Sequence, residues 1–406
     1  MEDPAALSPL ILLVGAVVVA STVVRAALNR IGAPALVGYL LLGLGLRLFN
    51  DHGFDFGAVG REVLGFLAIA GVIVLLFRVG LESKLTGLLD QLRSASVIWV
   101  GNVALSGLAG YVAARYLLSL ELIPSVLVGV ALTATSVGIP SEVWHEAQAI
   151  DTPAGQRFLD VAELDDITGI FMLALLAAVL PVLNEGGPAP QLATDLARQT
   201  GWLLLKLAGF VGVCLLFSRY GEQRCTRLFE GLHAAPDPVL PVVGMGFIIA
   251  AAAALLGFSA AIGAFFAGLA FSRDPDSVKF DASIGSLHAL FTPFFFVNIG
   301  FSLDPAVLGS ATTIGGLLLV AAVVGKLLGA GLPARLSVGW AGALILGVSM
   351  VPRAEICMLI MHRARAMGPW AAPPRVYAGM VVVCAITCVV APWVLRPLLR
   401  RRNDAS

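Results

Sequence analysis

The stretch GYLLLGL at residues 38–44 has a counterpart, GAFFAGL, at residues 263–269. A second pair keeps the same order, because FRVGL at residues 77–81 resembles VNIGF at residues 297–301. In both pairs the copies lie seven expected helices apart, and an odd separation turns one copy upside down relative to the other. Inverted repeats are typical of secondary transporters, which bind their substrates near the middle of the membrane between discontinuous helices. Chance similarity between glycine-rich apolar helices is the alternative.

The composition of the whole chain indicates a membrane protein. Of 406 residues, 58% are hydrophobic and only 13% are charged, and the mean hydropathy is +0.92. Soluble domains carry about 25% charged residues, so these values exclude a soluble enzyme or regulator. The 26 basic and 26 acidic side chains cancel, which argues against a nucleic-acid partner. We therefore predict an all-α polytopic membrane protein.

Apolar runs bounded by charged residues, proline or glycine give about thirteen transmembrane helices, since one span needs roughly 20 residues. They are 7–27, 35–48, 63–81, 94–118, 123–144, 158–183, 201–217, 240–256, 259–272, 287–303, 311–332, 338–361 and 376–399. We expect one membrane domain over residues 1–403, in which residues 1–183 form a first six-helix repeat and residues 239–399 a second. Residues 200–219 would form a linking helix.

The distribution of basic residues predicts the orientation. Most arginines and lysines fall on the side that also holds the C-terminus, so we expect the C-terminus in the cytoplasm and the N-terminus outside. Arg363, Arg365 and Arg375, in one expected outer loop, are an exception. The chain starts with Glu2 and Asp3 and lacks a cleavage site after its first apolar run, so that run should be retained.

The sequence lacks the common motifs of metal sites, nucleotide-binding sites and hydrolase active sites. Cys214, Cys225, Cys357, Cys384 and Cys388 lack the spacing of a zinc site or a disulfide framework, and we interpret them as reduced packing residues. The chain has no Walker A motif, nucleophile elbow or dinucleotide fingerprint. We expect neither an enzyme nor a bound cofactor.

Two adjacent carboxylates in the sixth segment are the strongest functional signal. In ELDDITG, residues 163–169, Asp165 and Asp166 lie about 12 to 13 Å beyond Arg157 at the cytoplasmic edge. That depth approaches the middle of a hydrocarbon core about 30 Å thick. A charge there costs at least about 2.5 to 3.5 kcal/mol, so the pair should face an aqueous cavity or a partner. A helix that begins later, leaving the pair in a loop, is the alternative.

Lys326 is the obvious partner for these carboxylates. It lies in VGKLLG, residues 324–329, about 13 Å beyond Arg335 at the same membrane face. A buried ammonium group keeps its proton beside a carboxylate and loses it more easily without one, as a proton-coupled carrier requires. The alternative is a lysine whose stem snorkels to the interface.

Two further segments combine a proline with polar residues at mid-span. TATSVGIP, residues 133–140, and SMVPRAE, residues 349–355, are candidates for unwound helices, because proline removes a helical hydrogen bond. The hydroxyl-bearing residues expected to line an ion site are Thr133, Thr135 and Ser136. Arg353 and Glu355 would neutralise the dipole ends of the half-helices. Two proline kinks with a structural Arg–Glu pair are the alternative.

Taken in order, these features resemble the second monovalent cation:proton antiporter family, the Kef- and NapA-like group, over nearly the whole chain. The motifs that carry the resemblance are 38–43, 76–82, 133–140, 165–166, 263–268, 294–304, 325–326 and 352–355. The resemblance implies a Na+/H+ antiporter-like fold with inverted repeats and two crossed discontinuous helices. It also implies a homodimer in a bacterial inner membrane, with helices one to three and eight to ten as scaffold.

The family pattern also implies roles for the charged residues. It places the Na+-binding carboxylate at Asp166, with Asp165 assisting and pairing with Lys326 when no cation is bound. Adjacent aspartates are similar to those of electrogenic sodium:proton exchangers. The sequence departs from the pattern at Ala354, where a glycine is common, and it ends at Ser406 without a nucleotide-binding regulatory domain.

The resulting hypothesis is a secondary active, electrogenic Na+/H+ antiporter that works by elevator-type alternating access. Na+, or Li+ or K+ in its place, would compete with protons for the acidic pair. K+/H+ exchange on the same scaffold is the nearest alternative. A cation channel or a non-transporting membrane sensor would tolerate loss of the carboxylates, and an organic-anion carrier is disfavoured because acidic residues repel its substrate.

Overall fold

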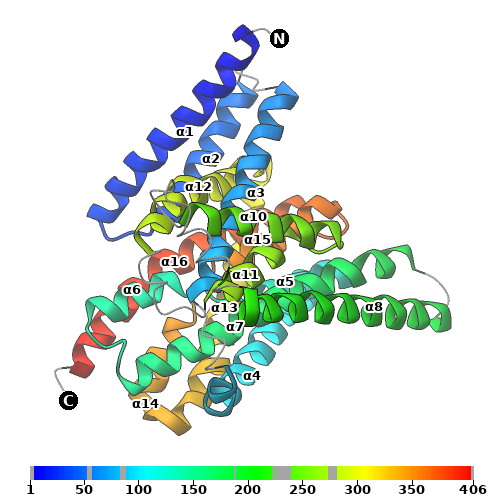
Figure 1. The fold of residues 1–406 in the computed structure, drawn as a ribbon. Coiled ribbons are helices and arrows are strands. Elements are labelled where there is room, and N and C mark those ends of the chain that lie inside the picture. Colours follow the sequence, from blue (N-terminus) through cyan, green and yellow to red (C-terminus); the bar gives the residue numbers. More distant parts are fainter. Residues whose placement is uncertain are drawn as a thin grey trace. The chain divides into compact units, whose positions relative to one another are not determined.

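The computed structural model describes residues 4–52, 57–82, 88–186, 189–221, 224, 239–272 and 281–403, and every regular element in these ranges is a helix (Figure 1). Each of the thirteen expected segments coincides with a helix or a helix pair. Nine helical stretches of the described chain are long and apolar enough to cross a membrane, and two shorter apolar helices join them. The all-α prediction is therefore confirmed. Glu2, Asp3 and Cys225 lie outside the described residues.

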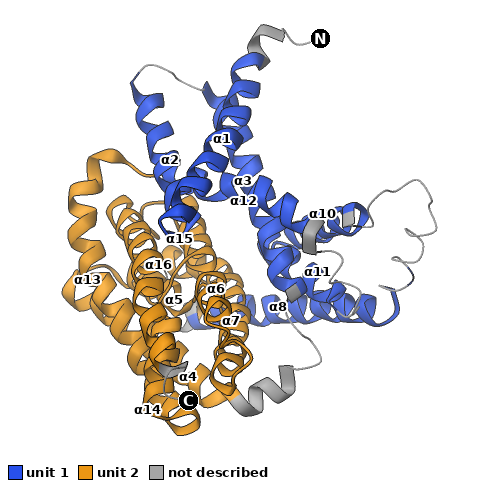
Figure 2. Ribbon diagram, turned by 90° about the vertical axis from the view of Figure 1, so that its left-hand side faces the viewer, with its two compact units in different colours: residues 1–88, 193–302 blue, residues 89–192, 303–406 orange. Residues whose placement is uncertain are grey.

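The chain forms two compact units, and both halves of the sequence contribute to each (Figure 2). Unit 1 comprises residues 1–88 and 193–302, and unit 2 comprises residues 89–192 and 303–406. The helices of unit 1 are α1 (Pro4–Arg30), α2 (Ala35–Asp51), α3 (Gly57–Glu82), α8 (Ala189–Leu216), the π-turn η2 (Phe217–Gly221), α10 (Val239–Leu255), α11 (Ala260–Phe271) and α12 (Asp281–Phe301).

Glycines bring α2 and α12 of unit 1 into backbone contact. A Cβ atom added at Gly43 in α2 would overlap the carbonyl oxygen of Val297 in α12. In return, a Cβ atom at Gly300 in α12 would overlap the carbonyl oxygen of Leu40 in α2. Only glycine allows so close an approach, which makes these two helices an interlocked pair.

A reciprocal pair of glycine–carbonyl contacts also joins α3 to α11. A Cβ atom at Gly268 would overlap the carbonyl oxygen of Phe77, and one at Gly80 would overlap the carbonyl oxygen of Phe265. These four residues are the repeat counterparts of the four that join α2 to α12. The short sequence similarity therefore corresponds to a duplicated packing contact, and chance similarity does not explain it.

Unit 2 holds the remaining helices, including both discontinuous ones. They are α4 (Leu88–Val112), the π-turn η1 (Ala113–Leu117), α5 (Leu122–Thr133), α6 (Gly138–Glu146), α7 (Pro153–Glu185), the short η4 (Pro305–Val307), α13 (Leu308–Lys326), the π-turn η5 (Leu327–Gly331), α14 (Leu332–Ser349), α15 (Glu355–Met367) and α16 (Pro374–Asn403).

The two breaks in unit 2 touch each other. One separates α5 from α6 and the other separates α14 from α15, as the proline-containing motifs predicted. The backbone N–H of Ser136 in the first break donates a hydrogen bond of 2.9 Å to the carbonyl oxygen of Pro352 in the second. The indole of Trp144 in α6 also donates to Ser349 at the end of α14, at 2.9 Å. Four half-helix ends therefore meet in one place.

Several boundaries differ from the sequence expectation, two of them at the ends of helices in unit 2. The helix expected to end at Leu332 continues into α14, and the chain turns at Gly339, whose φ of 70° favours glycine. The helix expected to end at Met361 reaches Met367, so Arg363 and Arg365 lie in α15 and not in a loop. Basic residues suit the last turns of a helix because its C-terminal end is negative.

We expect Gly43→Ala to destabilise the protein, because the new methyl group meets backbone that cannot rotate away. Overpacking of this kind costs about 1 to 3 kcal/mol, which should lower the melting temperature of the detergent-purified protein. Gly45→Ala is the matched control on the same helix, since nothing lies within 4 Å of a Cβ atom there. Equal melting temperatures for the two variants would contradict the interlocking of α2 and α12.

Candidate functional site

Asp165 and Lys326 form a buried ion pair at the centre of unit 2. The Nζ atom of Lys326 lies 3.0 Å from Oδ2 of Asp165, and the two side chains are 0% and 1% exposed. Helix α7 begins at Pro153, where the Thr152 side chain caps it by accepting from the Gly155 N–H. Asp165 is thus well inside a helix, which excludes the loop alternative. The burial of Lys326 likewise excludes snorkelling.

The break after α5 supplies the other partners of the Lys326 ammonium group. Its Nζ atom donates to Oγ1 of Thr135 at 2.8 Å and to the carbonyl oxygen of Thr133. That carbonyl is free to accept because the helix ends at Thr133 and its last carbonyls lack helical partners. Together with Asp165, these contacts satisfy the three N–H donors of a lysine.

The three hydroxyl residues expected to line the site differ in their contacts. Thr135 donates a 2.5 Å hydrogen bond to Oδ2 of Asp165 and so bridges the ion pair. Thr133 turns its hydroxyl back to the carbonyl oxygen of Val130, leaving only its own carbonyl at the site. Ser136 joins the two breaks through its backbone N–H.

Asp166 is also buried, with 6% of its surface exposed. Adjacent residues of an α-helix point about 100° apart, so the two carboxylates leave α7 in different directions. The assignment of Asp166 as the main cation-binding carboxylate stays a prediction.

Asn102 in α4 is a site residue that the sequence did not single out. Its Nδ2 atom donates a hydrogen bond of 2.9 Å to Oδ1 of Asp165, the carboxylate oxygen that Lys326 does not contact. Three residues earlier, the indole of Trp99 donates to Oγ1 of Thr168 in α7 at 2.9 Å. Its signal in the sequence is a carboxamide within an apolar span, which is weaker than the signal of an ionisable residue in the same place.

Arg353 lies within the second break, and Glu355 begins the half-helix that follows it. Arg353 is fully buried, and its guanidinium donates to the carbonyl oxygens of Met350 and Val351 at 2.9 and 3.1 Å, just after α14 ends. Glu355 is the first residue of α15. Each charge therefore offsets the dipole of its own half-helix. No ion pair joins these two residues, both of which the structure describes, so the alternative of an Arg–Glu pair is wrong. Ala354, between them, has a negative φ of −143°.

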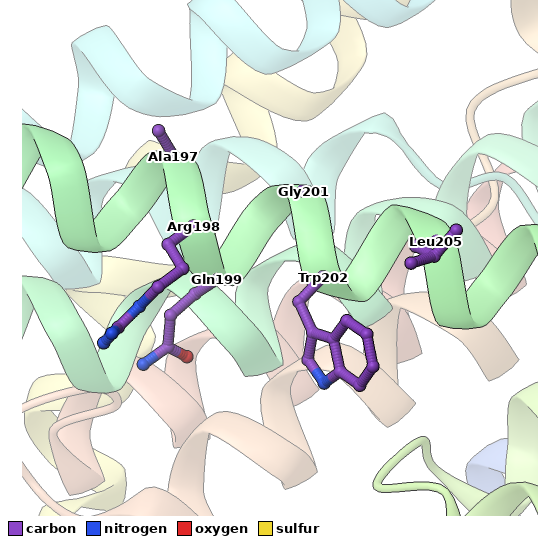
Figure 3. A pocket seen from close by; sticks show the side chains of 6 residues that line it. All are labelled: Ala197, Arg198, Gln199, Gly201, Trp202 and Leu205. Carbon is purple, nitrogen blue, oxygen red and sulfur yellow. The ribbon is translucent and has the colours of Figure 1, made fainter.

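Further polar features of the described chain are the cysteines, Lys206 and one surface hollow. Cys214, Cys357, Cys384 and Cys388 are free and buried, and no group of described residues has the arrangement of a metal centre. Lys206 in α8 donates to the carbonyl oxygen of Leu256 after α10 at 2.8 Å, which gives it a capping role. A surface hollow is lined by residues of α8 alone, with Arg198, Gln199 and Trp202 along one side (Figure 3). It holds none of the predicted site residues.

Comparison with known proteins identifies relatives of the chain. A family model described as sodium/hydrogen exchanger, transmembrane, matches residues 16–401. The high-affinity Na+/H+ antiporter NhaS3 of Synechocystis sp. is 29% identical over 343 residues, covering 82% of this chain and 71% of the relative. The Na+/H+-K+ antiporter GerN of Bacillus cereus is 27% identical over 387 residues, covering 93% and 92%.

A solved structure shows the same fold. The structure of the sodium proton antiporter MjNhaP1 from Methanocaldococcus jannaschii at pH 8 matches with a TM-score of 0.72 and 16% sequence identity. The match covers 98% of this chain and 99% of that one. The expected antiporter-like fold is therefore confirmed.

We expect Arg353→Met to destabilise unit 2, because it leaves buried carbonyl groups without a donor. Each such group costs about 1 to 3 kcal/mol, so the carbonyl oxygens of Met350 and Val351 together account for a loss of about 2 to 6 kcal/mol, which should appear as a lower melting temperature. Arg396→Met is the control, since Arg396 pairs with Glu146 at the surface with side chains 31% and 56% exposed, and such pairs contribute about 0 to 1 kcal/mol. Similar losses in both variants would show that Arg353 is not a buried cap.

Proposed function

Because the chain belongs to the sodium/hydrogen exchanger family, we propose that it is a secondary active Na+/H+ antiporter. The observation that carries the proposal is the buried ion pair of Asp165 and Lys326, bridged by Thr135 beside two helix breaks. A charged pair inside a membrane protein is costly and marks an ion or proton pathway. Here it provides a carboxylate for a cation and an ammonium group that can replace that cation.

The pair accounts for competition between cations and protons. In the arrangement observed, Lys326 neutralises Asp165 and occupies the oxygens of Thr135 and Thr133. A Na+ ion that takes this place needs the same oxygens, and Lys326 must then lose its proton to leave. Binding of the cation therefore releases a proton, and the return of the proton expels the cation.

The same scheme predicts electrogenic transport. With Na+ bound and Lys326 neutral, one cation faces the two carboxylates of Asp165 and Asp166. With two protons bound in place of one Na+, Lys326 carries the first and is charged, and Asp166 carries the second and is neutral. The two states differ in net charge, so a complete cycle moves charge across the membrane.

Every residue of this scheme belongs to unit 2, which favours elevator-type alternating access with unit 2 as the moving body. Unit 1 would be the fixed scaffold and, by the family resemblance, the dimer contact. We place the protein in a bacterial inner membrane, with the N-terminus outside and the C-terminus in the cytoplasm. The whole membrane domain would need no bound cofactor for this cycle.

K+/H+ exchange is the second candidate function. One observation favours it: GerN, which covers 93% of this chain, is named a Na+/H+-K+ antiporter. Hydroxyl and carbonyl oxygens such as those of Thr135 and Thr133 can coordinate either ion. Comparison of Na+, Li+ and K+ in a pH-gradient dequenching assay on proteoliposomes decides between the candidates.

We expect Asp165→Asn and Asp166→Asn each to abolish cation-dependent proton movement in proteoliposomes, since an amide cannot exchange a proton for a cation. Asp195→Asn, which removes an exposed carboxylate paired with Arg198, should retain exchange. If both site variants transported like the wild type, the protein would not be this antiporter. A cation-dependent current without proton movement would indicate a channel.

We expect Lys326→Gln to lower the current carried per transported Na+, because the site loses the group whose charge alternates during the cycle. The measurement is solid-supported-membrane current together with Na+ flux in the same proteoliposomes. Lys206→Gln removes a lysine that caps α10 and should leave the ratio unchanged. An unaltered ratio and pH profile in Lys326→Gln would remove Lys326 from the mechanism.

A further inference from the structure

The carboxamide of Asn102 has a buried oxygen that finds no hydrogen-bond partner in the described part of the chain. Asn102 is 0% exposed, and its Nδ2 atom donates to Oδ1 of Asp165 at 2.9 Å. The Oδ1 atom of the same amide accepts no hydrogen bond from any residue that the structure describes. An unpaired buried acceptor costs about 1 to 3 kcal/mol. We therefore expect this oxygen to bind a partner in another state of the site.

Asn102 occupies the position in the first repeat that Lys326 occupies in the second. The sequence VGN at residues 100–102 corresponds to VGK at residues 324–326. The packing follows the same correspondence, since a Cβ atom at Gly101 would lie 2.7 Å from the carbonyl oxygen of Gly329, and one at Gly325 would lie 3.4 Å from that of Leu105. The equivalent residues Asn102 and Lys326 therefore contact the two carboxylate oxygens of Asp165, one oxygen each.

The two side chains differ in what they can offer a cation. Lysine has three donors and no acceptor, whereas an asparagine amide has both donors and an acceptor. The terminal torsion of asparagine is broad and roughly two-fold, so rotation exchanges its oxygen and nitrogen without moving α4. The nitrogen suits a bare carboxylate, and the oxygen suits a carboxylate that carries a cation.

We propose that Asn102 is a cation ligand, whose amide oxygen turns towards the ion that replaces Lys326 at Asp165. This inference rests on the proposed function and adds a ligand from α4 to those from α5 and α7. Lys326 leaves the carboxylate when the cation enters. Asn102 stays beside the carboxylate, and its amide rotates so that the oxygen replaces the nitrogen. Asn102 therefore sets cation affinity, and it takes no part in proton binding.

The test is Asn102→Leu, which keeps the approximate size of the side chain and removes both polar ends. We expect the KM for Na+ to rise at least about tenfold, a ΔΔG of about 1.4 kcal/mol, with the current per Na+ unchanged. The stabilisation of the purified protein by NaCl relative to choline chloride should shrink in parallel, because a ligand stabilises the state that binds it. Asn102→Ser retains an acceptor, so its KM should rise less.

Ser106→Ala is the matched control, because Ser106 lies one turn further along α4, is equally buried, and has no bond to Asp165. It should keep the wild-type KM. A lower maximal rate with unchanged KM and unchanged NaCl stabilisation in Asn102→Leu would overturn the inference while the antiporter assignment stood. If the leucine variant does not fold, an unchanged KM in Asn102→Ser overturns it. Absence of Na+-dependent proton movement in the wild type would instead defeat the proposed function, and the inference with it.

Discussion

The cost of burying charge governs the arrangement of unit 2. An ammonium group and a carboxylate removed from water are stable together only when their geometry is good and their remaining donors and acceptors are satisfied. Lys326 meets this condition through Asp165, Thr135 and the carbonyl oxygen of Thr133. Asp165 meets it through Thr135 and Asn102. The pair therefore fixes the relative positions of α4, α5, α7 and α13.

The helix breaks follow from the same requirement. An intact α5 would keep the Thr133 carbonyl within its own hydrogen-bond ladder, and Lys326 would lack its third acceptor. Breaking a helix inside a membrane leaves further backbone groups unpaired, which is tolerated only where protein covers them. The contact of Ser136 with Pro352 and the guanidinium of Arg353 provide this cover. The ion pair and the two helix breaks therefore depend on each other for their hydrogen-bond partners.

The sequence was most informative where it broke its own apolar pattern. Asp165, Asp166, Lys326 and the two proline motifs could be found because charges and prolines are rare inside spanning helices. The match of depth between Asp165 and Lys326 followed from counting residues along each helix. Asn102 could not be predicted from the sequence, because neutral polar residues are common in such helices. Only the three-dimensional structure shows which of them contacts a carboxylate. Which hydroxyl contacts the ion pair, that of Thr135 or that of Ser136, also depends on the path of the backbone through the break. The periodicity of the sequence does not encode that path.

The two halves of the inverted repeat share their backbone packing but differ in their polar residues. The backbone packing is duplicated, as the reciprocal glycine contacts of α2 with α12 and of α3 with α11 show. The chemistry is not duplicated. At the first break α7 presents Asp165, whereas at the second break α16 presents the hydroxyl of Thr387 and the thiol of Cys388, which contact the backbone of Arg353. With no carboxylate on α16 at that point, Arg353 contacts backbone carbonyl oxygens, whereas Lys326 contacts a carboxylate. Symmetric packing with asymmetric polar residues therefore places the buried ion pair at the first break, which under the proposed function is where a single cation competes with Lys326.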